Sequence, residues 1–387
     1  MNSEFALERK SFKPESLPMI QKSFFTMLIA LVIAACCTSA VDQNTDNTKL
    51  AAKVDSLVND YMMKYHVPGL SIAIAKDGEI IYAKGYGFAD TAKRERVTPS
   101  SLFRMASVSK PFTSAAIMQL IESGKLNMSD KIFGDDGILG NIYGKPPYKG
   151  NVTNITIDEL LHHTCGGWSN NDNDPMFLDT GLTQTQIIAH TLDSLPLLNE
   201  PGKAYAYSNF GYCVLGRVIE KITGEHYEDY VRKHILQPAG ISDMQVGGNT
   251  LAERKPNEVI YYGQGGIYEN PYMYNIKRMD SHGGWIASAT SLLKFVLVVD
   301  SFTTKPDILK PATLTLMTTP SPANKNYACG WAVNSNYNWW HSGSLPGTAT
   351  ELVRAHNGYS WAILANTRTF DNGFTADMDQ LVWRALK

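Results

Sequence analysis

Strand-like segments lie near both ends of this 387-residue chain. Near the N-terminus, LSIAIAKDGEIIYAKGYGF (70–88) has two apolar runs around Asp77-Gly78, a dipeptide that strongly favours a hairpin turn. Near the C-terminus, four apolar runs precede an amphipathic segment at 374–386: YACGWAV (327–333), NWWHSGS (338–344), TELVRAH (350–356) and YSWAILAN (359–366). Because the middle, about 98–270, favours helices and loops, we predict one antiparallel sheet built from both chain ends and flanked by helices. The expected fold class is α+β, with a mostly helical subdomain inserted and a cleft for the functional site between the two parts.

Composition excludes some functions. Hydrophobic residues make up 44% of the chain and charged residues 19%, which is typical of a well-buried globular protein. The formal net charge of −2 shows no basic excess, so we expect no nucleic-acid partner.

The first 45 residues differ from the rest and are interpreted as a signal or lipoprotein segment with a polar tether, followed by one domain at 46–387. The stretch KSFFTMLIALVIAACC (22–37) has a lysine, a short apolar run and small residues, as in a signal peptide. IAAC (33–36) resembles a bacterial lipoprotein cleavage box, with Cys36 as the lipidated residue. A plain secretory signal, cleaved a few residues later, is the alternative. Either interpretation predicts an exported protein, periplasmic or attached to the outer membrane.

The segment FRMASVSKPF (103–112) raises the first chemical hypothesis. Ser107 stands three residues before Lys110 at an expected helix start, so both side chains share one helix face. A lysine buried there can have a lowered pKa and remove the proton of a serine nucleophile. Roughly one or two such S-x-x-K patterns are expected by chance in a chain of this length. A second one, Ser291 to Lys294, does occur.

Two downstream motifs could complete a site around Ser107. Tyr207 and Asn209 in YAYSNFGY provide a phenol and an amide, and HSGS supplies His341, Gly343 and Ser344 on an expected strand. A glycine there would let a substrate approach the strand edge. No Y-x-N pattern follows Ser291, so Ser107 is the serine with both partners after it.

These motifs and their surroundings resemble the serine β-lactamase and penicillin-binding-protein superfamily. The similarity covers about 50–385 and is strongest in four segments: VTPSSLFRMASVSKPFTSAAI (97–117), ITIDELLHHTCGG (155–167), PGKAYAYSNFGYCVLGRVIEKITGEHYEDYV (201–231) and HSGSLPGTAT (341–350). The branch that it resembles contains class C β-lactamases, D-alanyl-D-alanine carboxypeptidases, D-aminopeptidases and esterases.

The resemblance implies a role for each matching residue. Ser107 would be acylated, Lys110 would activate it, and Tyr207 would act as the acid and base that protonates the leaving group. Asn209 would contact a substrate amide. The backbone N–H groups of Ser107 and Ser344 would form the oxyanion hole.

His341 and Gly343 are also assigned to substrate binding. Class C β-lactamases usually carry a lysine at the position of His341, whereas a histidine is only partly charged near neutral pH. We therefore expect a D-alanyl peptidase, D-amino-acid amidase or esterase. A class C-like β-lactamase is the alternative, and a penicillin-binding sensor or scaffold without turnover is a second alternative of another class.

No metal or other cofactor is expected. His162, His163 and Cys165 lie close together, but no matching ligand pair stands elsewhere. The oxygen-rich segment 169–175 is interpreted as a solvated loop. Cys165, Cys213 and Cys329 are expected to be buried free thiols.

The predicted partner is a small-molecule or peptide substrate, with cell-wall fragments as candidates, and the only membrane contact would be a lipid anchor at Cys36.

Overall fold

The computed structural model describes residues 45–171, 174–178, 180–265 and 269–387. Residues Val54–Lys387 form one compact unit, and 45–53, the described residues before it, are helical. Cys36 and the expected signal segment lie outside the described residues. Among those described, no helix is both long and apolar enough to cross a membrane. The boundary at residue 46 and the subdomain at 98–270 stay predictions.

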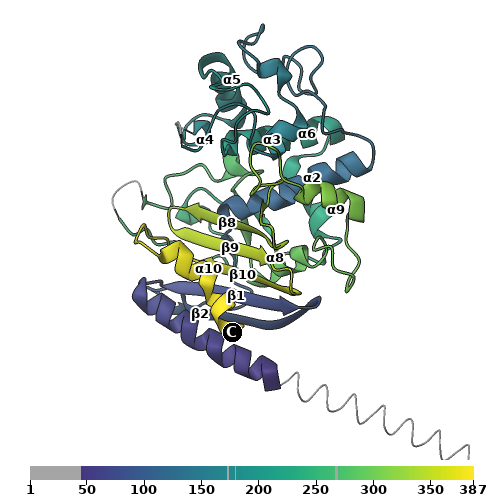
Figure 1. The fold of residues 1–387 in the computed structure, drawn as a ribbon. Coiled ribbons are helices and arrows are strands. Elements are labelled where there is room, and N and C mark those ends of the chain that lie inside the picture. The colour runs from purple at the N-terminus through teal and green to yellow at the C-terminus, as the bar shows by residue number, and fades with distance from the viewer. Residues whose placement is uncertain (1–44, 172–173, 179, 266–268) are drawn as a thin grey trace, which may run out of the picture. The chain divides into compact units, whose positions relative to one another are not determined.

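A seven-stranded sheet joins the two ends of the chain (Figure 1). Its order is β3-β2-β1-β10-β9-β8-β7, and every pairing is antiparallel. The strands are β1 Gly69–Lys76, β2 Glu79–Asp90, β3 Glu95–Arg96, β7 Ala332–Val333, β8 Trp339–Leu345, β9 Thr348–Arg354 and β10 Tyr359–Ala365. β1 pairs with β10, with Ile72 opposite Ile363. The hairpin at Asp77-Gly78 and the sheet built from both chain ends are therefore confirmed.

Helices cover both faces of this sheet (Figure 1). α8 (Ala289–Val296) packs on β1 and β10. α10 (Phe374–Ala385) lies on the opposite face, where Trp383 meets Trp361 of β10 with ring centroids 4.8 Å apart. Successive strand residues point to opposite faces, so Trp361 contacts α10 while its neighbours face α8.

The middle of the chain is helical, as expected. Its helices are α2 Ser109–Glu122, α3 Ile157–Leu161, α4 Pro175–Leu178, α5 Gln184–Ser194, α6 Asn209–Thr223 and α7 Tyr227–Val231, with α9 Pro311–Thr318 later in the chain. α2 is buried on almost all sides, and its Phe112 stacks on Phe295 of α8 at 3.8 Å. α2 therefore connects the helical part of the protein to α8, which covers one face of the sheet. The residues at the N-terminus of α2 lie between these two parts.

A three-stranded sheet, β4-β6-β5, leads the chain into α2. Its strands are β4 Phe103–Arg104, β5 Gln245–Val246 and β6 Trp285–Ala287. Met105, directly after β4, donates its N–H to the Trp285 carbonyl at 2.9 Å. The start of α2 is therefore held by a short strand.

One predicted strand is mostly absent. In YACGWAV only Ala332–Val333 is a strand. The chain turns before it, because Gly330 has φ +75° and Ala328 donates its N–H to the Trp331 carbonyl. A positive φ is incompatible with an extended strand, so the apolar run forms a buried turn.

Candidate active site

Ser107 lies in the short 3₁₀ turn Ala106–Val108, immediately before α2. Ala106 has φ +47°, a left-handed conformation that costs energy for a residue with a Cβ. The turn is held in place by Thr350 of β9, whose Oγ1 donates to the Met105 carbonyl at 2.9 Å. Ser107 is thus presented at a helix N-terminus by a strained turn that the large sheet supports.

Lys110, the second residue of α2, is completely buried beside Ser107. Its Nζ lies 3.1 Å from Ser107 Oγ, 2.6 Å from Asn209 Oδ1 and 2.9 Å from the His282 carbonyl oxygen. Burial lowers the pKa of Lys110 to about 7. The amide and carbonyl oxygens can only accept, so a neutral amine donates its two hydrogens to them and directs its lone pair at Ser107. This is the geometry of a general base.

Asn209 is held by a buried carboxylate. Its Nδ2 donates to Asp174 Oδ2 at 2.6 Å and to Asn170 Oδ1 at 3.2 Å. Because Asp174 accepts, Oδ1 of Asn209 is the atom that faces Lys110. Burial raises the pKa of Asp174, although the bond from Asn209 opposes this rise. The prediction of a solvated loop is therefore wrong for Asp174, which is 5% exposed.

Tyr207 lies between Lys110 and the expected oxyanion strand. Its ring centroid is 4.8 Å from Lys110 Nζ and 6.2 Å from the His341 ring centroid. Burial raises the pKa of Tyr207, while a hydrogen bond with Ser107 acts in the opposite direction. The phenol is therefore protonated at neutral pH. A lysine with a lowered pKa and a tyrosine with a raised one form a complementary base and acid.

His341 is the end of a buried hydrogen-bond chain. The Ser208 N–H donates to His163 Nδ1 (3.0 Å), so Nε2 of His163 carries the proton and donates to the Tyr327 hydroxyl (3.1 Å). Tyr327 must then donate to His341 Nε2 (3.0 Å), and His341 Nδ1 donates to the Ser342 carbonyl (2.6 Å). The imidazoles of His163 and His341, the two histidines in this hydrogen-bond chain, are therefore both neutral.

The expectation of a partly charged His341 is therefore wrong. Burial, together with the nearby Lys110, lowers the pKa of His341 to about 3. Both ring nitrogens bond within the protein, and the side chain is 5% exposed. His341 thus differs from the lysine of class C β-lactamases in charge at every physiological pH.

Gly343 has a packing role in the folded protein. A Cβ at this position would collide with the Met105 carbonyl oxygen and the Thr350 hydroxyl, and would lie 3.1 Å from Ala106 Cβ. The glycine therefore makes room for the turn that carries Ser107. That it also admits substrate to the strand edge stays a prediction. Ser344 points to the other side of β8, where Arg368 Nη1 lies 3.2 Å from its Oγ.

A cavity of about 70 Å³ brings most of the predicted residues together. It is lined by Ala106, Ser107, Asn170, Phe177, Tyr207, Asn209, Met279, His282, Gly283, Ser344 and Leu345. Lys110, His341 and Gly343 are not among the lining residues. Of the lining residues, Asn170 belongs to the segment that the sequence predicts as a solvated loop, and His282 has no role in the sequence-based hypothesis. The sequence did not indicate Asp174, which accepts from Asn209, or Tyr327, which donates to His341, because no motif marks a residue that acts through a neighbour.

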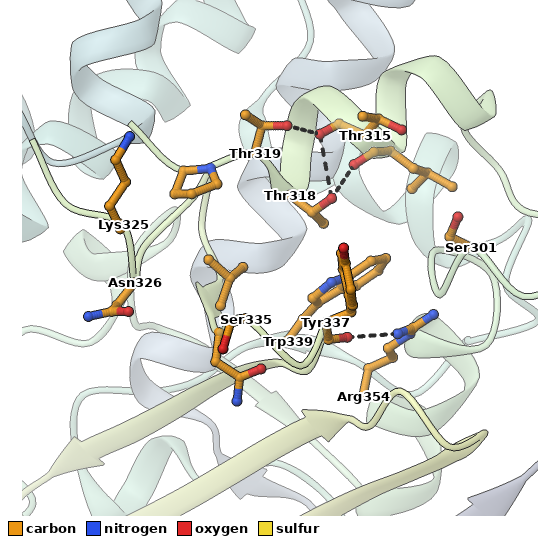
Figure 2. Close-up of a pocket in the computed structure, with 14 residues that line it drawn as sticks. Ser301, Thr315, Thr318, Thr319, Lys325, Asn326, Ser335, Tyr337, Trp339 and Arg354 are labelled. Atoms are coloured by element: carbon orange, nitrogen blue, oxygen red, sulfur yellow. Dashed lines mark hydrogen bonds between the residues drawn. The ribbon is translucent and has the colours of Figure 1, made fainter. Parts of the chain in front are cut away.

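A larger cavity, about 760 Å³, lies away from these groups (Figure 2). It is bordered by α9, the turn before β8 and Arg354 of β9. Arg354 is enclosed by Trp339 and Phe302 and donates to the Tyr337 carbonyl at 2.9 Å. The pair of Ser107 and Lys110 does not belong to this cavity, so the smaller cavity is the candidate active site.

The second S-x-x-K pattern and the three cysteines do not form a further catalytic or metal site. Ser291 Oγ donates to Asp243 Oδ1 at 2.6 Å, and Lys294 Nζ donates to the Gly240 carbonyl, so these two side chains do not meet. Cys165, Cys213 and Cys329 are buried free thiols, as predicted. Within the described ranges, no three His, Cys, Asp or Glu residues are grouped to hold a metal ion.

Comparison with known proteins gives consistent matches. The sequence model of the family described as Beta-lactamase matches residues 54–383. Protein flp of Staphylococcus aureus (strain NCTC 8325 / PS 47) is 27% identical over 331 residues, which cover 81% of this chain and 62% of flp. Penicillin-binding protein 4* of Bacillus subtilis (strain 168) is 27% identical over 311 residues, or 73% of this chain and 64% of that protein. The chain thus spans less than two thirds of these relatives.

Among solved structures, D-amino acid amidase from Ochrobactrum anthropi SV3, complexed with D-phenylalanine, superposes with a TM-score of 0.71. The two sequences are 21% identical, and the match covers 87% of this chain and 98% of that one. At this level of identity the likeness concerns the fold, and it agrees with the predicted α+β architecture.

Proposed function

The chain belongs to the β-lactamase family, and on this premise we propose that it is a serine hydrolase that works through an acyl-serine intermediate. The observation that carries the proposal is Lys110, buried, with a pKa of about 7 and Nζ 3.1 Å from Ser107 Oγ. An amine with this pKa can accept a proton at neutral pH, where a solvated lysine cannot.

In acylation, neutral Lys110 takes the proton of Ser107 as Oγ attacks the substrate carbonyl. The oxyanion that forms would be bound by the backbone N–H groups of Ser107 and Ser344. Tyr207 gives its proton to the leaving nitrogen or oxygen as the bond to the carbonyl carbon breaks, and the proton on Lys110 restores the phenol. Water then attacks the acyl-serine by the same route, and Ser107 regains its proton.

The proposed substrate is a small amide or ester, as for a D-alanyl peptidase, a D-amino-acid amidase or an esterase. Three features support this choice: the relative named as a penicillin-binding protein, the fold shared with a D-amino acid amidase, and the neutral His341. A β-lactam and a D-Ala-D-Ala peptide both carry a carboxylate, and a neutral imidazole gives it no permanent positive charge, so His341 favours an amide or ester without a carboxylate. A class C-like β-lactamase is therefore the second candidate.

A substrate panel tests the proposal. Purified protein would be given a D-Ala-D-Ala peptide, a D-amino-acid amide, a p-nitrophenyl ester and a chromogenic cephalosporin. We expect turnover of an amide or ester that is lost in Ser107→Ala. Acylation without turnover of any substrate would instead support the sensor, and preference for the cephalosporin would support a β-lactamase.

We further propose that the protein is exported and anchored through a lipid on Cys36. The support is the sequence alone, namely the apolar run 24–35 and the IAAC box. A cell-wall fragment would then be within reach of the site as substrate.

A further inference from the structure

One buried histidine differs from the other three. His162, His163 and His341 each have both ring nitrogens within hydrogen-bond distance of a partner. His282 is equally buried, 2% exposed, yet neither of its ring nitrogens has a hydrogen-bond partner among the described residues. An unpaired buried polar group is destabilising and therefore calls for a function.

The place of His282 suggests that function. It lines the 70 Å³ cavity together with Ser107, Tyr207 and Ser344. Its backbone carbonyl accepts from Lys110 at 2.9 Å, which puts the residue beside the proposed base. Since that contact uses only the main chain, the imidazole is free for another partner.

The two ring nitrogens of His282 are not equivalent. Nε2 is fully enclosed by protein and has no hydrogen-bond partner among the described residues. Because His282 lines the cavity, we infer that Nδ1 is the ring nitrogen on the cavity side. Burial, followed by the charges of Lys110, Arg278 and Arg217, holds the pKa of His282 well below its usual range, so the ring is neutral. An enclosed acceptor without a partner is less unfavourable than an enclosed N–H. The proton therefore belongs on Nδ1.

We propose that His282 is a specificity-determining residue whose Nδ1–H donates to an oxygen on the acyl part of the substrate, next to the scissile carbonyl. This inference rests on the proposed function and names its substrate class: acyl donors with a hydroxyl, alkoxy or acylamino oxygen near that carbonyl. The positive charges of the nearby Arg278 and Arg217 favour an oxygen over an ammonium at this position. The cavity is small, about 70 Å³, which favours a compact oxygen-bearing substituent over a large one.

A matched pair of esters tests this assignment. The p-nitrophenyl esters of methoxyacetate and butyrate have the same shape, with one oxygen replaced by CH₂. The ratio of their kcat/KM values in the wild type, divided by the ratio in a variant, cancels their different intrinsic reactivity. One lost hydrogen bond predicts a fall of about three- to tenfold in His282→Leu. His282→Asn, whose Nδ2 can replace Nδ1, should retain most of the preference, and exposed His190→Leu should leave it unchanged. An unchanged ratio in folded His282→Leu would overturn the assignment.

A second measurement does not depend on catalysis or on the Leu variant folding. In the ¹⁵N spectrum of the Ser107→Ala protein, we expect His282 as the neutral Nδ1–H tautomer, with its Nδ1 signal shifted by 2-methoxyacetamide but not by butyramide. An Nε2–H tautomer, or equal shifts with both amides, would overturn the inference. If no ester acylates wild-type Ser107, the proposed function fails, while this spectrum still decides the role of His282.

Discussion

Asn209 donates from Nδ2 to Oδ2 of Asp174 at 2.6 Å, and this bond determines which end of the Asn209 amide contacts Lys110. An asparagine amide can face either way, and the buried carboxylate accepts only from its NH₂ end. The Oδ1 end is therefore left for Lys110, also at 2.6 Å. Asp174 thus orients the amide and, through its charge, opposes the fall in the pKa of Lys110 that burial causes.

Asp174→Asn should move the acid limb of the pH profile to lower pH. Removal of the carboxylate charge removes the effect that raises the pKa of Lys110, so burial lowers it further. The measurement is kcat/KM for p-nitrophenyl butyrate between about pH 5 and 9 in both proteins. Exposed Asp371→Asn is the control. A limb that stays in place would mean that Asp174 has no electrostatic effect on the base.

In the wild type, kcat/KM for a neutral ester should be half-maximal near pH 7, the pKa of Lys110. The active form is the neutral amine, so activity rises through this pH and falls by about tenfold per unit well below it. Tyr207, with a raised pKa, stays protonated over this range. A profile that falls as pH rises through 7 would contradict the assignment of Lys110 as base.

A fluorophosphonate or fluorescent penicillin should label Ser107, as peptide mapping of the labelled protein would show. Ser107→Ala should lower kcat by about 10³-fold or more, because the nucleophile is lost. Ser291→Ala is the matched control, since Ser291 belongs to the second S-x-x-K pattern but bonds to Asp243. Label on Ser291 would overturn the site.

The preference between a penicillin and a p-nitrophenyl ester should not change between about pH 5.5 and 8.5 on account of His341. Its pKa of about 3 keeps the imidazole neutral throughout, so it does not gain or lose charge for the penicillin carboxylate. The ratio of the two kcat/KM values at each pH is the readout. A ratio that falls with a midpoint near pH 6.5 would show a titrating His341 and contradict the buried chain through Tyr327.

Cys36→Ser should release the protein from the membrane if IAAC is a lipoprotein box, because the thiol that carries the lipid is absent. Detergent partitioning of the wild type and the variant measures this. A wild-type protein that already partitions into water would favour the plain secretory signal.

The sequence by itself determined the fold class and the main members of the site. The apolar runs around Asp77-Gly78 and at 350–366 are local patterns, and the strands that they predict exist because β1, β9 and β10 are buried along almost their whole length, with helices on both faces. Ser107 and Lys110 are three residues apart at a helix start, so their contact follows from helical spacing.

Only the tertiary structure decided the charge states and the supporting residues. Asp174, His163 and Tyr327 act on Lys110, Asn209 and His341 from elements far apart in sequence, and no spacing rule relates such segments. The pKa values of Lys110 and His341 depend on burial, which arises only when the helices and the sheet close around them. For the same reason, HSGS in the sequence indicates a histidine on a strand, whereas the packed fold makes that histidine neutral and assigns its glycine to the turn below Ser107.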